Sequence, residues 1–259
     1  MIMKTPLSVV KVGGALVEDA ASLAALLASF SALPALKVLV HGGGRAATRL
    51  CEALGIESRM VAGRRVTDEK TLEVVTMVYG GLVNKRIVAG LQALGINALG
   101  LTGADLGYML ADKRPVGEVD YGWVGDVRSV DTSVLSDLIA RGVVPVLAPL
   151  TCDGAGHLLN TNADTIAAEA AKALAERFDV TLVYCFEKKG VLADPSDEES
   201  VIPLITRSSY PGLLASGIVS GGMVPKLDNA FAALDAGVSA VRITCASALG
   251  SCSGTVIRI

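Results

Sequence analysis

Short apolar runs that stop at glycines alternate with Ala- and Leu-rich stretches along most of the chain. The run at residues 7–10 leads into Lys11-Val12-Gly13-Gly14, and the run at residues 38–40 leads into His41-Gly42-Gly43-Gly44. A β-branched run that ends at glycines and then takes on helical periodicity predicts a strand, a tight loop and a helix. Because right-handed crossovers bring consecutive units of this kind together, we expect the two glycine loops to lie side by side on neighbouring parallel strands.

The same alternation continues to the end of the chain. Further strands are predicted at residues 96–101, 143–147, 180–186, 238–244 and 255–259, and helices at 46–54, 67–94, 132–141, 165–177, 206–216 and 223–237. Residues 56–65 indicate a hairpin, and residues 108–131 a small antiparallel excursion that serves as a lid. Strands that alternate with helices favour an α/β fold, with an open, mainly parallel sheet and helices on both faces.

The composition agrees with this fold and excludes several classes of protein. Of 259 residues, 51% are hydrophobic and only 4% aromatic, which suits helices packed on buried parallel strands. A net charge of −3 gives no electrostatic footprint for nucleic acid or an anionic membrane. The uncharged stretch at residues 20–36 is too short and too interrupted to span a bilayer, and the N-terminal segment does not fit a signal peptide.

The cysteines and histidines predict neither a disulfide framework nor a metal site. The five cysteines are odd in number and scattered, without a Cys-x-x-Cys pair, and the chain has only two histidines. We therefore expect free thiols, a cytoplasmic location and no metal held by side chains. His41 is expected to orient its glycine loop, and His157 to be a partly exposed turn residue.

Three glycine loops carry the candidate chemistry. Each precedes a predicted helix, where free backbone N–H groups can bind an anion, and lysines stand beside two of them, at Lys11 and Lys226. Neither the Gly-x-Gly-x-x-Gly dinucleotide motif nor the P-loop motif occurs. Before the helix at residues 165–177 stand Asn160, Asn162 and Asp164, of which a helix cap needs only one.

This ordered set of motifs resembles the amino-acid kinase family, and within it the enzymes that phosphorylate N-acetylglutamate. The matching segments are residues 10–14, 41–44, 63–67, 160–164 and 221–226. The resemblance implies two lobes that share one sheet. Residues 1–177 would form an acylglutamate-binding lobe with lid hairpins, and residues 178–259 a nucleotide-binding lobe.

The resemblance also implies transfer of the γ-phosphoryl group of ATP, bound with Mg²⁺, to the side-chain carboxylate of N-acetyl-L-glutamate, a step of arginine biosynthesis. A carboxylate is already ionised at neutral pH, so no general base is needed. The task is to bring two anions together and to neutralise charge on the transferring group. Lysines and backbone amides are suited to that task.

By resemblance, the charged residues of the glycine loops are catalytic. Lys11 and Lys226 would clamp the phosphoryl oxygens from opposite sides, and Asp164 would hold both lysines. The amides of Gly13 and Gly14 would bind phosphate. An alternative for Lys226 is a surface lysine in a first helical turn.

The substrate would be held by a second group of residues. By resemblance, the amides of Gly43 and Gly44 would contact the attacking carboxylate, Arg65 would bind the α-carboxylate through two hydrogen bonds, and Asn160 would bind the same end. An alternative for Arg65 is a solvated charge on the hairpin.

The chain departs from the family pattern in two places. Relatives carry an Asp-Val type of turn where this chain has residues 186–190, so adenine and ribose contacts are not carried over, and Lys188 and Lys189 become candidates to reach phosphate. Residues 103–128 border the acyl pocket with a composition of their own. The choice between acetyl and succinyl therefore stays open.

Other functions stay open as well. The same fold could serve a carbamate or uridylate kinase, or a non-catalytic amino-acid sensor. Arginine-inhibited relatives carry an extra N-terminal helix, whereas the first strand here is predicted to begin by Leu7. We therefore expect a homodimer that arginine does not inhibit, joined through the helix at residues 68–94.

Overall fold

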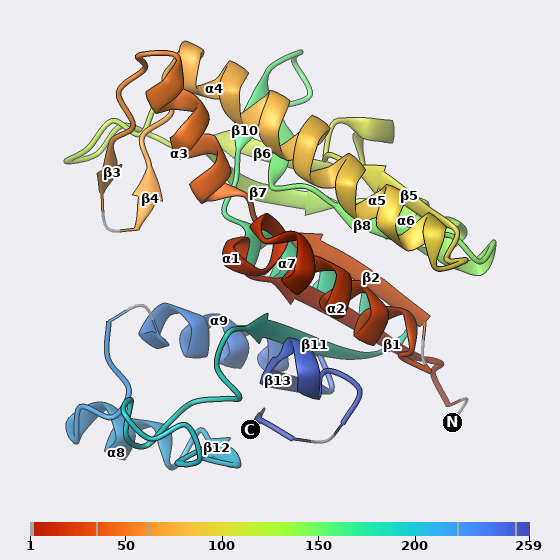
Figure 1. The fold of residues 1–259 in the computed structure, drawn as a ribbon, viewed down its shortest axis with the longest axis vertical. Coiled ribbons are helices and arrows are strands. Elements are labelled where there is room, and N and C mark those ends of the chain that lie inside the picture. Colours follow the sequence, from red (N-terminus) through yellow and green to blue (C-terminus); the bar gives the residue numbers. More distant parts are fainter. Residues whose placement is uncertain (1–2, 35, 62, 222, 252) are drawn as a thin grey trace.

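A central eight-stranded sheet runs through the whole molecule (Figure 1). The computed structural model describes residues 3–34, 36–61, 63–221, 223–251 and 253–259; Gly222 of the third glycine loop and Cys252 lie outside these ranges. The strands of the sheet are β1 (Pro6–Val12), β2 (Leu36–His41), β5 (Ala98–Leu101), β8 (Val144–Leu147), β11 (Asp179–Phe186), β12 (Leu204–Thr206), β13 (Ala240–Cys245) and β14 (Thr255–Arg258).

The order of these strands is β12-β14-β13-β11-β1-β2-β8-β5. Neighbouring strands are parallel except for β13 and β14, which pair antiparallel. This arrangement confirms the predicted open, mainly parallel sheet. The strand β1 lies near its centre, between β2 and β11.

Helices cover both faces of the sheet. Consecutive strand residues point to opposite faces, so Val9 and Val10 belong to two different hydrophobic cores. The core around Val9 is covered by α6 (Thr132–Ala140), α7 (Ala163–Leu174) and α9 (Met223–Asp235). The core around Val10 is covered by α1 (Gly14–Glu18), α2 (Ala20–Ser31), α3 (Gly44–Ala53), α4 (Glu69–Val75), η1 (Thr76–Val83) and α5 (Asn84–Ala93).

Two smaller sheets stand beside the main one. The strands β3 (Met60–Val61) and β4 (Arg64–Arg65) form the predicted hairpin. A four-stranded sheet has the order β10-β9-β6-β7, from β6 (Met109–Lys113), β7 (Gly125–Val130), β9 (Leu150–Cys152) and β10 (Leu158–Asn160). The antiparallel pair β6–β7 is the excursion expected at residues 108–131, whereas β9 and β10 were not predicted.

The segment Glu69–Ala93 is one continuous helical rod whose middle part, η1, is π-helical around Gly80 and Gly81. Its N-terminus is capped by Asp68, which accepts from the Thr71 N–H over 2.7 Å. Among the described residues it is the one helix whose length and composition would allow it to cross a membrane. Of its most apolar stretch of 18 residues, 44% is buried inside the protein.

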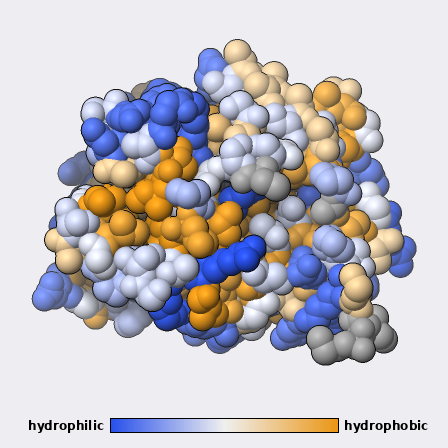
Figure 2. Space-filling view, turned by 90° about the horizontal axis from the view of Figure 1, so that it is seen from below, coloured by the Kyte–Doolittle hydropathy of each residue, from blue (hydrophilic) through white to orange (hydrophobic). Residues whose placement is uncertain are grey.

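The segment predicted as a helix at residues 206–216 differs in the structure. Thr206 ends strand β12, and the helix α8 (Tyr210–Ala215) begins just before Pro211, because proline fits the first turn of a helix and not its interior. Two short 3₁₀ turns, η2 (Asp105–Gly107) and η3 (Ala246–Ala248), complete the elements. Seen from the side of α8 and β12 (Figure 2), hydrophobic residues gather in a band on the surface, and Leu204 and Leu214 are exposed in this part of the chain.

Candidate active site

The two N-terminal glycine loops lie in contact, as predicted. The strands β1 and β2 are paired with Val12 opposite His41, so both loops leave the same edge of the sheet. A Cβ atom on Gly42 would lie 3.4 Å from the amide nitrogen of Gly14, and one on Gly14 would lie 3.7 Å from that of Gly43. The backbones of the two loops are therefore close enough that a Cβ atom at either position would be in van der Waals contact with the other loop.

The structure divides the roles of Gly13 and Gly14. The N–H of Gly13 donates to the Cys185 carbonyl over 3.0 Å and continues the β1–β11 pairing. The Gly13 N–H is therefore not available to bind phosphate. The role expected for the Gly13 amide is thus wrong. Both glycines line a cavity at this end of the sheet, together with Lys11, Gly44, Phe186 and Lys226 among others.

A carboxylate lies between two lysines at the edge of this cavity. Asp164 binds the Lys11 ammonium through Oδ1 and the Lys226 ammonium through Oδ2, each over 2.7 Å. The three side chains come from β1, α7 and α9. Lys226 is thus not the freely solvated lysine of the alternative interpretation.

Burial and charge act against each other in this trio. Burial lowers the pKa of Lys11, and the attraction of Asp164 does not fully offset that effect. Burial alone would raise the pKa of Asp164, but Lys11 and Lys226 together hold it below the usual value. The trio therefore carries one carboxylate against two ammonium groups, with a surplus of positive charge that favours an anionic ligand.

Asn162 leaves Asp164 available to both lysines. Its side-chain oxygen accepts from the Asp164 N–H over 2.7 Å and caps α7. Of the three polar side chains before this helix, one serves as the cap, as predicted. The carboxylate of Asp164 stands in the first turn, where the helix dipole favours a negative charge.

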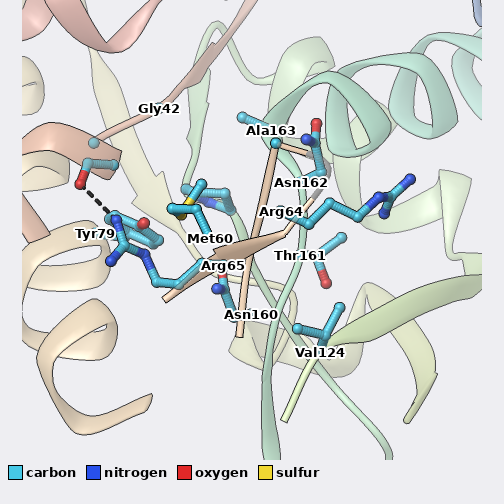
Figure 3. A pocket seen from close by; sticks show the side chains of 14 residues that line it. Gly42, Met60, Arg64, Arg65, Tyr79, Val124, Asn160, Thr161, Asn162 and Ala163 are labelled. Carbon is cyan, nitrogen blue, oxygen red and sulfur yellow. Dashed lines mark hydrogen bonds between the residues drawn. The ribbon is translucent and has the colours of Figure 1, made fainter. Parts of the chain in front are cut away.

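A second cavity of about 190 Å³ adjoins the first one, because Gly44 lines both. Figure 3 shows it, with Arg64 and Arg65 leaving strand β4 in opposite directions. Its lining also includes Gly42, Gly43, Met60, Gly63, Tyr79, Val124, Pro149, Asn160, Thr161, Asn162 and Ala163.

Arg65 is 7% exposed and belongs to the wall of this cavity. Its Nη2 donates to the Gly44 carbonyl and to the Thr48 hydroxyl, each over 2.8 Å, and its Nη1 donates to Ser58. A solvated hairpin charge is therefore excluded. The guanidinium is held in place against the second glycine loop.

Asn160 lines the same cavity and is 9% exposed. Its Nδ2 donates to the Thr67 hydroxyl over 2.9 Å, which fixes the plane of the amide. The structure thus brings Arg65 and Asn160 to one cavity and the two lysines to the adjoining one, with Asp164 between the lysines.

Sequence reasoning missed several residues of the second cavity. Tyr79 projects from the π-helical segment η1, and a Cβ atom on Gly43 would lie 2.9 Å from its ring. Met60, Arg64 and Val124 also line the cavity. A tyrosine or valine at the spacing of a helix or strand cannot be told from a residue of the hydrophobic core. The hydrophobic pattern of the sequence therefore did not identify these positions as part of a binding site.

The two histidines and the two lysines after β11 have interaction partners that indicate their roles. Nδ1 of His41 lies 2.8 Å from the Gly42 carbonyl, which confirms that His41 orients the loop. His157 is exposed and interacts with Asp153. Lys188 and Lys189 are paired with Glu198 and Glu199 on the surface and do not line the cavity of the lysine trio.

Within the part of the chain that the structure describes, no group of three or more His, Cys, Asp or Glu residues could hold a metal ion. The four described cysteines, Cys51, Cys152, Cys185 and Cys245, are free.

Comparison with known proteins identifies close relatives over the full length. A model described as the amino acid kinase family matches residues 6–245. An acetylglutamate kinase from Phocaeicola vulgatus is 64% identical over 256 residues, which cover 99% of this chain and 100% of the relative.

Two solved structures share the fold. The protein smu.665 from Streptococcus mutans is 28% identical, with a TM-score of 0.80 over 97% of this chain and 98% of that one. N-acetylglutamate synthase from Neisseria gonorrhoeae, complexed with coenzyme A and N-acetyl-glutamate, is 25% identical with a TM-score of 0.82. The similarity covers 99% of this chain and 60% of the synthase chain.

Proposed function

The chain belongs to the amino acid kinase family, and from that premise we propose that it phosphorylates the side-chain carboxylate of N-acetyl-L-glutamate with ATP, as a step of arginine biosynthesis. The observation that carries the proposal is the Lys11–Asp164–Lys226 trio, whose two lysines line a cavity that adjoins the one holding Arg65 and Asn160. The 64% identity to an acetylglutamate kinase over the full length supports the choice of substrate.

The trio supplies what phosphoryl transfer between two anions needs. Lys226 donates one of its three N–H groups to Asp164, and Lys11 forms an ion pair with the same carboxylate, so the other N–H donors can bind oxygens of the transferring group. Asp164 fixes both ammonium groups before the substrates arrive, so little reorganisation is required in the transition state. Phosphate and the attacking carboxylate would further contact the amides of Gly14 and of Gly43 and Gly44.

The second cavity would hold the acylglutamate. Arg65 would bind the α-carboxylate, and Asn160 would bind the same end of the substrate. Their hydrogen bonds to Gly44 and Thr67 keep both side chains oriented without substrate. We assign residues 1–177 to an acylglutamate-binding lobe, with residues 108–131 as a lid, and residues 178–259 to a nucleotide-binding lobe.

Mg²⁺ fits this site only as a companion of the nucleotide. The described residues offer no carboxylate cluster, and the one acidic side chain of the trio is occupied by two lysines. Bound to ATP, the ion would supply neutralising charge on the phosphate oxygens.

One observation favours N-succinylglutamate as a second candidate substrate. Arg64 lines the second cavity and is exposed, so it adds a second cationic side chain to the cavity wall, on the other side of β4 from Arg65. A succinyl group ends in a carboxylate, which a guanidinium can bind, whereas an acetyl group ends in a methyl group.

The reaction is tested by trapping its product. Phosphorylation of a carboxylate gives a mixed anhydride, which hydroxylamine converts to a hydroxamate, whereas a phosphate ester would give none. We expect Mg²⁺- and ATP-dependent hydroxamate with N-acetylglutamate or N-succinylglutamate.

Carbamate and UMP should not stimulate ATP consumption, and free glutamate should be a poor substrate because its ammonium would lose its hydration in a pocket shaped for a neutral amide. Turnover of neither acylglutamate would contradict the proposal and favour a sensor.

Assembly is part of the same proposal. The helical rod Glu69–Ala93 exposes Met77 and Leu82, whose exposed fractions are 53% and 45%. An apolar groove beside it is lined by Leu72, Met77 and Trp123 among others. We infer a homodimer that buries this side of the rod, and a cytoplasmic location consistent with the free cysteines.

A further inference from the structure

We propose that Phe186 is a positioning residue for phosphoryl transfer, which holds the ammonium groups of Lys11 and Lys226 over its ring. This inference rests on the proposed function and names a residue that the function did not use. The Lys11 Nζ lies 4.9 Å from the centre of the phenyl ring, and the Lys226 Nζ lies 4.7 Å from it. Both distances are within the range of a cation–π interaction.

The ring is held in a fixed place at the end of β11. On one side Tyr184 stacks on it, with ring centres 6.2 Å apart and planes only 6° from parallel. On another side the ring faces Gly13, where a Cβ would lie in van der Waals contact, 3.4 Å from Cδ1 of the ring. Phe186 is therefore a rigid surface between the first glycine loop and the lysine pair.

The charge of the site explains why an aromatic ring is useful there. One carboxylate, Asp164, faces two ammonium groups, so a positive charge remains uncompensated when no phosphate is bound. The face of a phenyl ring is electron-rich and attracts cations. It also accepts no strong hydrogen bond, so the N–H donors that Asp164 leaves free stay available for phosphoryl oxygens. A second carboxylate at this position would compete with the substrate for them.

The ring also opposes the effect of burial on Lys11. The charged groups that face this lysine are Asp164 of α7 and Lys226 of α9, and the Cys185 thiol of β11 lies beside it. Burial lowers the pKa of Lys11, and the repulsion by Lys226 acts in the same direction. A cation–π contact favours the charged form, so removal of the ring should lower the pKa of Lys11 further.

The first experiment compares turnover in matched variants. Phe186→Leu and Phe186→Met remove the ring face but keep an apolar side chain, and Phe186→Tyr keeps the face. Phe178→Leu is the control, because Phe178 is also half-buried, packs against the same core and immediately precedes β11, at the end of the strand away from Phe186.

We expect kcat to fall about 10-fold in Phe186→Leu and Phe186→Met, from the loss of two cation–π contacts, with the KM for acylglutamate changed less than about 2-fold. Phe186→Tyr should retain most of the turnover. An unchanged kcat in both ring-less variants would overturn the proposal. An equal loss in Phe178→Leu or no recovery in Phe186→Tyr would overturn it too, because the effect would then be one of packing.

A second experiment does not depend on the reaction. The pKa of Lys11 is measured by NMR titration of its ε-carbon in the wild-type protein, Phe186→Leu and Phe186→Tyr, with Lys11→Arg used to assign the signal. We expect a lower pKa in Phe186→Leu than in the other two. An equal pKa in all three would overturn the inference about Phe186. A lowered pKa in a protein that phosphorylates neither acylglutamate would support the inference and contradict the proposed function.

Discussion

Asn84 donates a hydrogen bond through Nδ2 to Nε2 of His41 over 3.1 Å and thereby ties the long helical rod to the second glycine loop. The other ring nitrogen, Nδ1, faces the Gly42 carbonyl, which can only accept. His41 is therefore neutral, with its proton on Nδ1. The same Asn84 amide also donates to the Val146 carbonyl over 3.0 Å, so helix, loop and sheet meet at one side chain.

Protonation of His41 is predicted to weaken the fold. Complete burial lowers the pKa of His41 from 6.5 to about 4. Between these values the unfolded chain binds a proton that the folded chain does not. Stability contributed by the neutral ring is thus present above pH 6.5 and is lost as the pH falls toward 4, by about 3 kcal/mol in total.

The measurement is an NMR titration of His41 in a His157→Gln variant, in which His41 is the single histidine. Urea unfolding of the same variant across this pH range gives the free energy of unfolding. A titration midpoint of His41 above pH 6 would show that the ring is not held neutral by burial.

Gly100 is predicted to tolerate no side chain, because it makes room for Asn84. A Cβ at this position would lie 1.7 Å from the Asn84 Oδ1 and 2.8 Å from the Lys85 Nζ. We expect Gly100→Ala to lower the free energy of unfolding by about 2 kcal/mol. The KM for acylglutamate should also rise, because the displaced Asn84 no longer holds His41.

Gly81→Ala is the matched control for this substitution. Nothing lies within 4 Å of a Cβ there, and alanine favours a helix over glycine by about 1 kcal/mol. Urea unfolding should show no loss of stability in the control. Equal stability of the two variants would mean that the space at Gly100 is not needed.

Lys226→Ala is predicted to lose about 100-fold in turnover, or roughly 3 kcal/mol of transition-state stabilisation, with a smaller change in substrate affinity. Lys188→Ala is the control, because Lys188 is an exposed lysine paired with Glu198 and should leave turnover unchanged. Steady-state kinetics with both substrates varied separates kcat from KM. A Lys226→Ala enzyme with full turnover would remove this residue from the mechanism.

The dimer proposal is tested by placing a charge on the rod. Met77→Glu puts a carboxylate in the centre of the proposed interface, where burial without a partner is costly, so we expect a monomer by light scattering. Met3→Glu is the control, because Met3 is 93% exposed and far from the rod in sequence. Retention of the same mass in Met77→Glu and in the wild-type protein would place the interface elsewhere.

The sequence predicted the parts of the site that have local signals. A glycine pair after a β-branched run identifies a loop, and the excess of Asn and Asp before α7 exceeds what one cap needs. The resemblance to the family, and not these local signals, grouped Lys11 and Lys226 around Asp164, and the structure shows the three side chains in contact. The adjacency of the glycine loops followed from the handedness of the crossovers.

Other features depend on distant contacts and had no such signal. Gly13 gives its N–H to Cys185, which is far along the chain, so its loss as a phosphate donor emerges only from the β1–β11 register. Tyr79 and Phe186 are aromatic residues whose spacing resembles core. The π-helical segment that brings Tyr79 against Gly43 was not predicted. The strands β9 and β10 have three residues each, too few to show a period.

The position of β1 between β2 and β11 sets a limit on how the molecule can move. The strand is paired with β11 over seven residues and with β2 over six. A hinge that separated the two proposed lobes would have to break the β1–β11 backbone ladder, since neighbouring strands lie only about 4.8 Å apart. The proposed nucleotide and acylglutamate sites therefore lie on one continuous sheet, in which β1 and β11 are directly paired. Substrates would then enter and leave through movements of the surface hairpins that contain β3 and β7. Crosslinking either hairpin to its surroundings should therefore slow substrate binding and product release, and leave the distance between the two bound substrates unchanged.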